Sequence, residues 1–326
     1  MAREMMYGEA IAAAIMEEME RDSSVVFYGQ NLAMTERDPF LRKFGKKRVR
    51  IAPISETAEM GVAVGAAITG LRPIVELWMS EFMLVAFDEL INEAPRLRYM
   101  SGGQVKVPLV FKAGYGFAAG WAGQHSNCVY HTMMGVPGLK VALPSTAADA
   151  KGLMAAAIRD DNPVVYLHHY MLTLDKGPVP EGEHIVPFGV ADVKREGSDV
   201  TIVATGWMVK KSLASAELLA KEGISAEVVD PRTLAPLDVE TILKSVKKTG
   251  RLVLVDQATR HASAAAIIAA EMAEHGGDAL KAPVKMVTAL DTSIPFSEPL
   301  ESYVLPSEEK IVLAVKSVFA KQVAVV

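Results

Sequence analysis

Two short segments of the sequence carry residue types that could do acid–base chemistry. His125 follows a glycine-rich run at residues 114–120, where backbone freedom precedes an imidazole that titrates near neutral pH. Glu56 follows Ser55 at the start of a predicted helix, where Ser55 could cap the helix and Glu56 would favour the positive end of its dipole. A lone histidine is usually structural, and capping alone explains the second segment. The residues by themselves therefore leave a catalytic and a structural interpretation open for each.

The glycine-rich run also resembles a dinucleotide-binding loop, but its third glycine comes one position too late for the usual spacing. The sequence contains no Walker-type lysine loop, no nucleophile elbow, no Cys-x-x-Cys and no His-Glu-x-x-His motif. Hydrolase, nucleotidase and zinc-enzyme functions therefore lose support.

The composition is that of a globular protein with more than one domain. The chain has 326 residues, of which 50% are hydrophobic and 22% are charged, and this length favours two domains. A net charge of −5 argues against nucleic-acid binding, which needs clustered basic residues. No apolar stretch is long enough for a membrane span, no signal peptide is visible, and the single cysteine, Cys128, excludes an internal disulfide. We therefore expect a cytoplasmic protein.

Alternating helical and strand patterns predict a parallel α/β fold in the first part of the chain. Short β-branched runs between helices are typical of buried strands. The expected strands are residues 24–29, 73–78, 107–113, 139–143 and 163–167, and the expected helices are residues 9–20, 58–69, 82–100 and 147–159.

A proline-containing segment separates this part from a second α/β series. Pro178, Pro180 and Pro187 exclude a regular element there, so we predict a linker at residues 171–187. The predicted domains are residues 1–185 and 186–326, and both are expected to be doubly wound α/β domains. In the second, strands are expected at residues 200–205, 226–230 and 252–256, and helices at residues 208–221, 239–248, 262–273 and 308–320.

A series of segments spread over nearly the whole chain matches one known family. They include Ala52-Pro53-Ile54-Ser55-Glu56, Gly70-Leu71-Arg72-Pro73-Ile74-Val75-Glu76, Gln124-His125-Ser126 and Arg232-Thr233-Leu234. The chain resembles the beta subunits of the decarboxylase components of 2-oxo acid and acetoin dehydrogenases, which are relatives of transketolase. The resemblance implies an N-terminal pyrimidine-binding domain and a C-terminal transketolase-type domain.

The resemblance also implies a cofactor and a partner. In that family an alpha2beta2 heterotetramer holds thiamine diphosphate at each alpha–beta interface, and the beta chain supplies the pyrimidine side. The motif that binds the diphosphate and Mg²⁺, Gly-Asp-Gly, belongs to the alpha subunit. This sequence contains no Gly-Asp-Gly, as expected for a beta subunit.

Five residues match cofactor-binding positions of the family. By that match Glu56 hydrogen-bonds a ring nitrogen of the aminopyrimidine, and the shared proton promotes formation of the cofactor's nucleophilic carbon. Trp78 and Phe82 match positions that pack around the pyrimidine, and core packing is a compatible alternative for both. Ile54 and Gln30 complete the expected cofactor-binding set.

Two further residues match catalytic positions. His125 would face the substrate, where a hydrogen-bond donor can stabilise negative charge that develops on oxygen. The resemblance thus favours the catalytic interpretation of this histidine. Asp88 matches an acidic position in a water-filled passage that links the two cofactors, and a solvated helical carboxylate is the alternative.

A last set of residues matches a structural site for a monovalent cation, expected to be potassium. Backbone carbonyls and one or two side-chain oxygens would enclose the ion, and oxygen ligands suit a hard cation. A helix-end loop without an ion is the alternative. The matching residues are Leu109, Ala157, Ile158, Asp160 and Asn162.

The sequence departs from the family at positions where carboxylates are usual. Gln30 stands where the family carries a glutamate, His168 replaces an acidic residue, and Gln257 replaces another glutamate. Neutral or imidazole groups there would weaken a proton relay and alter the field around a substrate. We infer a divergent substrate, such as a bulkier ketone or diketone rather than pyruvate. The extra tail at residues 321–326 also casts doubt on docking to an acyltransferase core.

Three functions remain for comparison. The first is cleavage of a 2-oxo acid, acetoin or a related ketone with an alpha subunit, followed by acyl transfer to the lipoamide of an acyltransferase core. The second is a non-oxidative thiamine-diphosphate lyase or transketolase-like enzyme that never meets lipoamide. The third is a non-catalytic scaffold or regulatory subunit, because fold alone does not fix function. Retention of Glu56 and His125 argues against the third.

Overall fold

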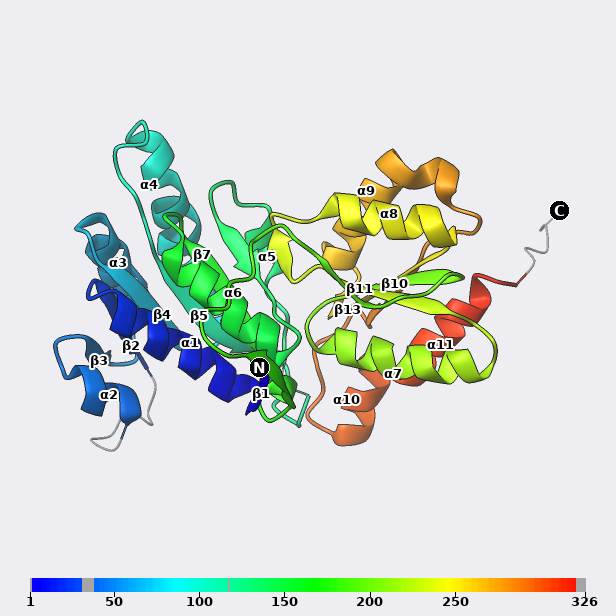
Figure 1. The fold of residues 1–326 in the computed structure, drawn as a ribbon, viewed down its shortest axis with the longest axis horizontal. Coiled ribbons are helices and arrows are strands. Elements are labelled where there is room, and N and C mark those ends of the chain that lie inside the picture. The colour runs from blue at the N-terminus through cyan, green and yellow to red at the C-terminus, as the bar shows by residue number, and fades with distance from the viewer. Residues whose placement is uncertain (1, 31–37, 117, 321–326) are drawn as a thin grey trace. The chain divides into compact units, whose positions relative to one another are not determined.

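The computed structural model describes residues 2–30, 38–116 and 118–320, which form two units (Figure 1). Unit 1 contains residues 1–117, 124–188 and 233–236, and unit 2 contains the rest. Each unit is an α/β structure with a sheet of its own, which confirms the predicted fold class. The boundary between residues 185 and 186 stays a prediction.

The main sheet of unit 1 has the strand order β12-β6-β7-β5-β4-β2-β3. Neighbouring strands are parallel except β12, which runs antiparallel to β6. The five strands predicted here are all present, with ends shifted by at most three residues. The bounds are Val25–Gly29 (β2), Val49–Ile51 (β3), Arg72–Met79 (β4), Val110–Tyr115 (β5), Lys140–Ala142 (β6), Val164–His169 (β7) and Thr233–Ala235 (β12).

Helices cover both faces of this sheet. The helices α1 (Tyr7–Arg21) and α6 (Ala147–Arg159) pack against each other across one face, in front of the strands in Figure 1. The helix α3 (Glu56–Ile68) packs on β4 from the opposite face. Neighbouring side chains in β2 mark the two sides: Phe27 points toward α1, whereas the Tyr28 hydroxyl donates to the Glu59 carbonyl in α3. Short helices α2 (Pro39–Phe44) and α5 (His131–Met134) complete this part.

The helix predicted at residues 82–100 is wrong as a single element. The chain forms a 3₁₀ segment η1 (Ser80–Ala86), a π-helical segment η2 (Glu89–Glu93) and the helix α4 (Ala94–Met100). Pro95 lies in the first turn of α4. Proline lacks an N–H group and its ring clashes with the carbonyl four residues earlier, so the backbone widens before it rather than continuing as a regular helix.

The prediction that prolines exclude a regular element within residues 171–187 is wrong. This segment contains β8 (Lys176–Pro180), which pairs antiparallel with β1 (Ala2–Met6), and the short η3 (Tyr170–Leu172) precedes it. Pro178 and Pro180 are tolerated because β8 has one partner strand, and prolines two residues apart can both turn away from that partner.

Unit 2 has a second sheet with the order β14-β13-β10-β11-β9, in which β9 is antiparallel and the other neighbours are parallel. Ile202 packs on the face covered by α7 and α11, and Val203 packs on the face covered by α8 and α9. In the described residues no helix is both long and apolar enough to cross a membrane. The bounds are Asp192–Arg195 (β9), Val200–Ala204 (β10), Ala226–Asp230 (β11), Leu252–Thr259 (β13), Lys285–Ala289 (β14), Trp207–Lys221 (α7), Val239–Thr249 (α8), Ala264–Gly276 (α9), Gly277–Ala279 (η4), Glu298–Val304 (α10) and Glu308–Ser317 (α11).

Candidate active site

Glu56 and Gln30, both expected near the cofactor, meet at the carboxyl edge of the sheet in unit 1. Gln30 follows the last residue of β2, and its side-chain amide donates to Glu56 Oε1 at 2.9 Å. The end of β2 presses closely on β4, because a Cβ added at Gly29 would lie 2.1 Å from the Glu76 carbonyl oxygen. The Gln30 N–H donates to that same carbonyl. Backbone packing therefore fixes the end of β2, from which the Gln30 side chain donates to Glu56.

At the start of α3, Ser55 does not have the expected role of a side-chain cap. The Ser55 side chain makes no capping hydrogen bond, and its backbone N–H instead donates to Glu59 Oε1 at 3.2 Å. Glu59 is 3% exposed, and no described group is a hydrogen-bond partner of its Oε2. Burial raises the pKa of Glu59, hydrogen bonds from Gln30 and Ser55 oppose the shift, and the charge of Glu56 adds to it. The sequence analysis missed this second carboxyl, although its spacing from Glu56 was visible.

A second cluster holds His125. The rings of Phe82 and His125 meet edge to face with centroids 5.7 Å apart. Beside them, Glu81 Oε1 accepts the Asn127 N–H at 2.7 Å, so the segment that carries His125 is tied to η1. Burial raises the pKa of Glu81, while hydrogen bonds from Asn127 and Ser80 and the charge of His125 oppose the shift. Glu81 was also missed, because no sequence motif marks it.

Trp78 lies at the end of β4 with 49% of its surface exposed. Its carbonyl accepts the Tyr170 hydroxyl, and the Tyr170 ring lies against Gly114, where an added Cβ would be 2.2 Å from ring carbons. Burial raises the pKa of Tyr170, and the charges of Glu76 and Glu81 add to that shift. Tyr170 is therefore held as a neutral phenol beside Trp78.

Ile54 and Asp88 lie on the surface of unit 1. Ile54 precedes α3 and is 71% exposed, which is unusual for a large apolar side chain unless another surface covers it. Asp88 is exposed at the start of η2 and accepts a hydrogen bond from Asn92 Nδ2 at 2.6 Å. Their expected roles in cofactor binding and in a proton passage stay predictions.

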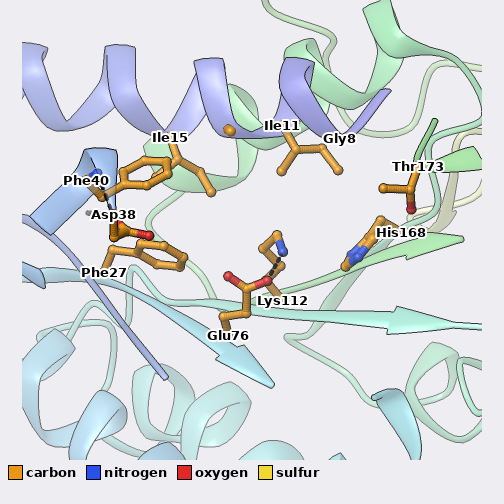
Figure 2. Close-up of a pocket in the computed structure, with 11 residues that line it drawn as sticks. Gly8, Ile11, Ile15, Phe27, Asp38, Phe40, Glu76, Lys112, His168 and Thr173 are labelled. Carbon is orange, nitrogen blue, oxygen red and sulfur yellow. Dashed lines mark hydrogen bonds and ion pairs between the residues drawn. The ribbon is translucent and has the colours of Figure 1, made fainter. Parts of the chain in front are cut away.

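Figure 2 shows a cavity between α1 and the sheet, with a volume of about 230 Å³. Four adjacent strands each contribute one side chain to it, namely Phe27, Glu76, Lys112 and His168. Lys112 and Glu76 form an ion pair there. Burial and the nearby charge of Lys112 hold the pKa of His168 well below its usual range, so this imidazole is neutral. The ring centroid of His168 lies 5.4 Å from that of Tyr170.

The oxygens of the expected potassium site already have partners. Arg72 Nη1 donates to the carbonyls of Ile158 at 3.1 Å and Asp160 at 2.9 Å. The Asp160 carboxylate pairs with Lys140, and Asn162 Oδ1 accepts from Arg98 at 2.6 Å. Backbone carbonyls retain a second lone pair for a cation, whereas the side-chain oxygens face cationic groups. The expected cation site at these residues stays a prediction.

Three remaining expectations concern a metal ion, Gln257 and the C-terminal tail. No group of three or more His, Cys, Asp or Glu side chains in the described part of the chain could hold a metal ion. Gln257 lies buried on β13 of unit 2. The tail at residues 321–326 lies outside the described residues.

Comparison with known proteins gives the family of both parts of the chain. The family model described as the transketolase pyrimidine binding domain matches residues 3–173, and the transketolase C-terminal domain matches residues 189–311. Among solved structures, a split gene transketolase described as an inactive beta4 tetramer is similar, with a TM-score of 0.79, 26% identity, and coverage of 96% of this chain and 97% of that one.

Curated relatives are more similar in sequence. The beta subunit of acetoin:2,6-dichlorophenolindophenol oxidoreductase from Cupriavidus necator is 44% identical over 97% of this chain and 98% of its own length. The beta subunit of the pyruvate dehydrogenase E1 component from Rickettsia felis is 44% identical over 95% and 97%. The 2-oxoisovalerate dehydrogenase beta subunit from Bacillus subtilis is 39% identical over 96% and 98%. The chain therefore belongs to the transketolase-like family of beta subunits of thiamine-diphosphate-dependent acetoin and 2-oxo acid dehydrogenases.

Proposed function

We propose that this chain is the pyrimidine-side half of an enzyme that cleaves the C–C bond next to the carbonyl of a 2-oxo acid, acetoin or a related ketone and transfers the acyl group to lipoamide. The observation that carries the proposal is Glu56, a carboxyl at the first position of α3, oriented by Gln30 at the carboxyl edge of the sheet. Ligands of open α/β sheets bind at that edge. Family membership supports the same assignment.

The chain's residues have distinct tasks in this proposal. Thiamine diphosphate, when bound, supplies a nucleophilic carbon that adds to the carbonyl and then stabilises the electron pair left by cleavage. Glu56 holds a proton at a ring nitrogen of the pyrimidine, and Trp78 and Phe82 exclude water from that ring. His125, held by the contact of its segment with Glu81, donates a hydrogen bond to the substrate oxygen as charge develops there.

Two features support the proposed partners: a motif that the sequence lacks and apolar side chains that are exposed in the structure. The sequence has no Gly-Asp-Gly motif, so an alpha subunit would bind the diphosphate and Mg²⁺ in an alpha2beta2 heterotetramer. Exposed Ile54, two residues before Glu56, and exposed Trp78, at the end of β4, supply apolar surface that such a subunit would cover. A lipoyl acyltransferase core as acyl acceptor, a structural potassium ion, and a cytoplasmic location belong to the same proposal.

A second candidate is a transketolase-like or other non-oxidative reaction without lipoamide. The similarity to a split gene transketolase favours it, and so do Gln30 and His168, which stand where the family usually carries acids. The two candidates differ in electron flow. Only the oxidative enzyme passes electrons from the cleaved substrate to an acceptor.

The test is co-expression with the alpha subunit, followed by calorimetric titration of thiamine diphosphate and Mg²⁺ into the purified complex. Turnover is then measured with acetoin, pyruvate and 2-oxoisovalerate, using reduction of an artificial dye or of lipoamide as the readout. Cofactor binding with dye reduction supports the oxidative proposal. Cofactor binding with ketol transfer between sugars and no dye reduction supports the second candidate. A stable complex that binds no cofactor would leave only the scaffold function.

A further inference from the structure

Glu59 is a buried acid for which the proposed chemistry gives no role. It lies on α3, one turn after Glu56, and faces the end of β2. Its backbone carbonyl accepts the Tyr28 hydroxyl, which pins this turn of the helix to the strand. Its Oε2 is buried and has no hydrogen-bond partner among the described residues. An ionised carboxylate is costly in such a place, because one oxygen gains neither solvent nor a donor.

Glu59 belongs to a cluster of three polar side chains. Gln30 donates to Glu56 Oε1, and a hydrogen bond from Gln30 also acts on Glu59. Residues three apart on a helix are neighbours on one face, so the two carboxyls repel each other when both are ionised. The groups that act on Glu59 are Gln30, Ser55, Glu56 and the Tyr28 phenol, and none of them is a cation. Elsewhere around α3, the side chain of Glu89 in η2 approaches Gly61 and would add only negative charge.

Two acids in one poorly solvated cluster retain a proton between them, as other close carboxyl pairs do. Glu59 is the more deeply buried of the two, whereas Glu56 is partly exposed at the sheet edge. The proton therefore belongs mainly to Glu59. A neutral carboxyl at this position lets Glu56 ionise and reprotonate without a second charge beside it.

We propose that Glu59 is a positioning residue of the active site, a neutral carboxyl that forms a proton-sharing pair with Glu56 across Gln30. It acts through Glu56 and does not touch the cofactor. This inference rests on the proposed function of Glu56. It also explains why an amide at Gln30 is suitable. The amide donates a hydrogen bond to one carboxyl, and the proton of the pair is held on the other.

The competing explanation is that Glu59 only caps α3 by accepting the Ser55 N–H. Two variants separate the explanations. Glu59→Gln keeps a carbonyl oxygen for Ser55 but has no titratable proton, whereas Glu59→Ala removes both functions. Glu93→Gln, at an exposed glutamate in η2, is the matched control.

The first measurement needs no cofactor. Infrared difference spectra of the full chain near neutral pH, wild type minus Glu59→Gln, should contain the band of a protonated carboxyl. The corresponding spectrum for Glu93→Gln should contain none. Absence of the band in the Glu59→Gln spectrum would overturn the inference.

The second measurement uses the complex with its alpha subunit. Loss of the proton from Glu59 at high pH would place a second charge beside Glu56, so the pH profile of kcat/KM of the wild type should contain a high-pH limb that is absent in Glu59→Gln, where no second acid remains. An unmoved profile in Glu59→Gln, with only Glu59→Ala impaired, would show capping alone and overturn the inference. If the wild-type complex binds no thiamine diphosphate while the infrared band is present, the proposed function fails and the carboxyl pair stands.

Discussion

Replacement of Glu81 tests whether the segment that carries His125 is held by a single carboxyl. Glu81 Oε1 accepts the Asn127 N–H at 2.7 Å, and Oε2 accepts from the Ser80 hydroxyl at 3.1 Å. In Glu81→Ala the Asn127 N–H loses its acceptor, which costs about 1–3 kcal/mol. If the loss of this hydrogen bond displaces His125 and raises the activation barrier by the same free energy, turnover of the complex falls by about 10- to 100-fold, since 1.4 kcal/mol is a factor of ten.

Glu81→Gln is the matched control, because it keeps an acceptor oxygen for Asn127. We expect its turnover to stay within about five-fold of wild type, less than a kcal/mol of transition-state stabilisation. The assay is steady-state dye reduction by the complex, with urea unfolding of both variants to measure their stability. Turnover of Glu81→Ala equal to that of wild type would refute the reasoning.

The pH dependence of stability gives an independent check on the same residue. Burial raises the pKa of Glu81, so the folded chain keeps a proton that the unfolded chain has already lost. The stability that Glu81 contributes is thus fully present below its ordinary pKa and is lost as pH rises through the folded value. Glu81→Gln should flatten this decline in urea unfolding across that range. Identical slopes for wild type and variant would contradict the assignment.

Three further predictions concern the scaffold. Glu18→Ala removes the buried carboxylate that pairs with Arg159, which is partly exposed and keeps Glu183 as a partner, and should lower the free energy of unfolding by about 1–3 kcal/mol in urea; an unchanged free energy would contradict this. Gly114→Ala forces the Tyr170 ring aside and should destabilise by about 1–3 kcal/mol, whereas Gly65→Ala, in an open helical position, should stabilise by about 0.5–1 kcal/mol. Potassium at 100 times its dissociation constant should stabilise the chain by about 2.7 kcal/mol over tetramethylammonium at equal ionic strength, and equal melting temperatures would exclude the site.

The sequence predicted elements best where local signals and packing agree. The helix α6 spans its predicted range, residues 147–159, because Thr146 caps it by accepting the Asp149 N–H and an apolar face follows. The strand β8 was missed because its prolines suggest a loop, and its pairing with β1 depends on residues far away in the chain. The segment at residues 82–100 has a helical pattern, yet Pro95 breaks the regular hydrogen bonding.

The residues of the candidate site also differ in whether the sequence could identify them. Glu56, Phe82 and His125 could be named because they match positions of the family that the sequence resembles. Glu59 and Glu81 could not, because their importance lies in burial and in hydrogen bonds to groups on other elements. Composition and spacing carry no information about which carboxyl loses its solvent, and the fold alone decides that.

The most direct test of the central claim is the turnover of Glu56→Gln in the assembled complex. The variant keeps the size of the side chain and an acceptor for Gln30 but cannot hold or release a proton. The account predicts an intact complex whose kcat falls by about 10²- to 10⁴-fold, the usual contribution of a positioned acid–base group. A variant that assembles, binds thiamine diphosphate and turns over at the wild-type rate would contradict it.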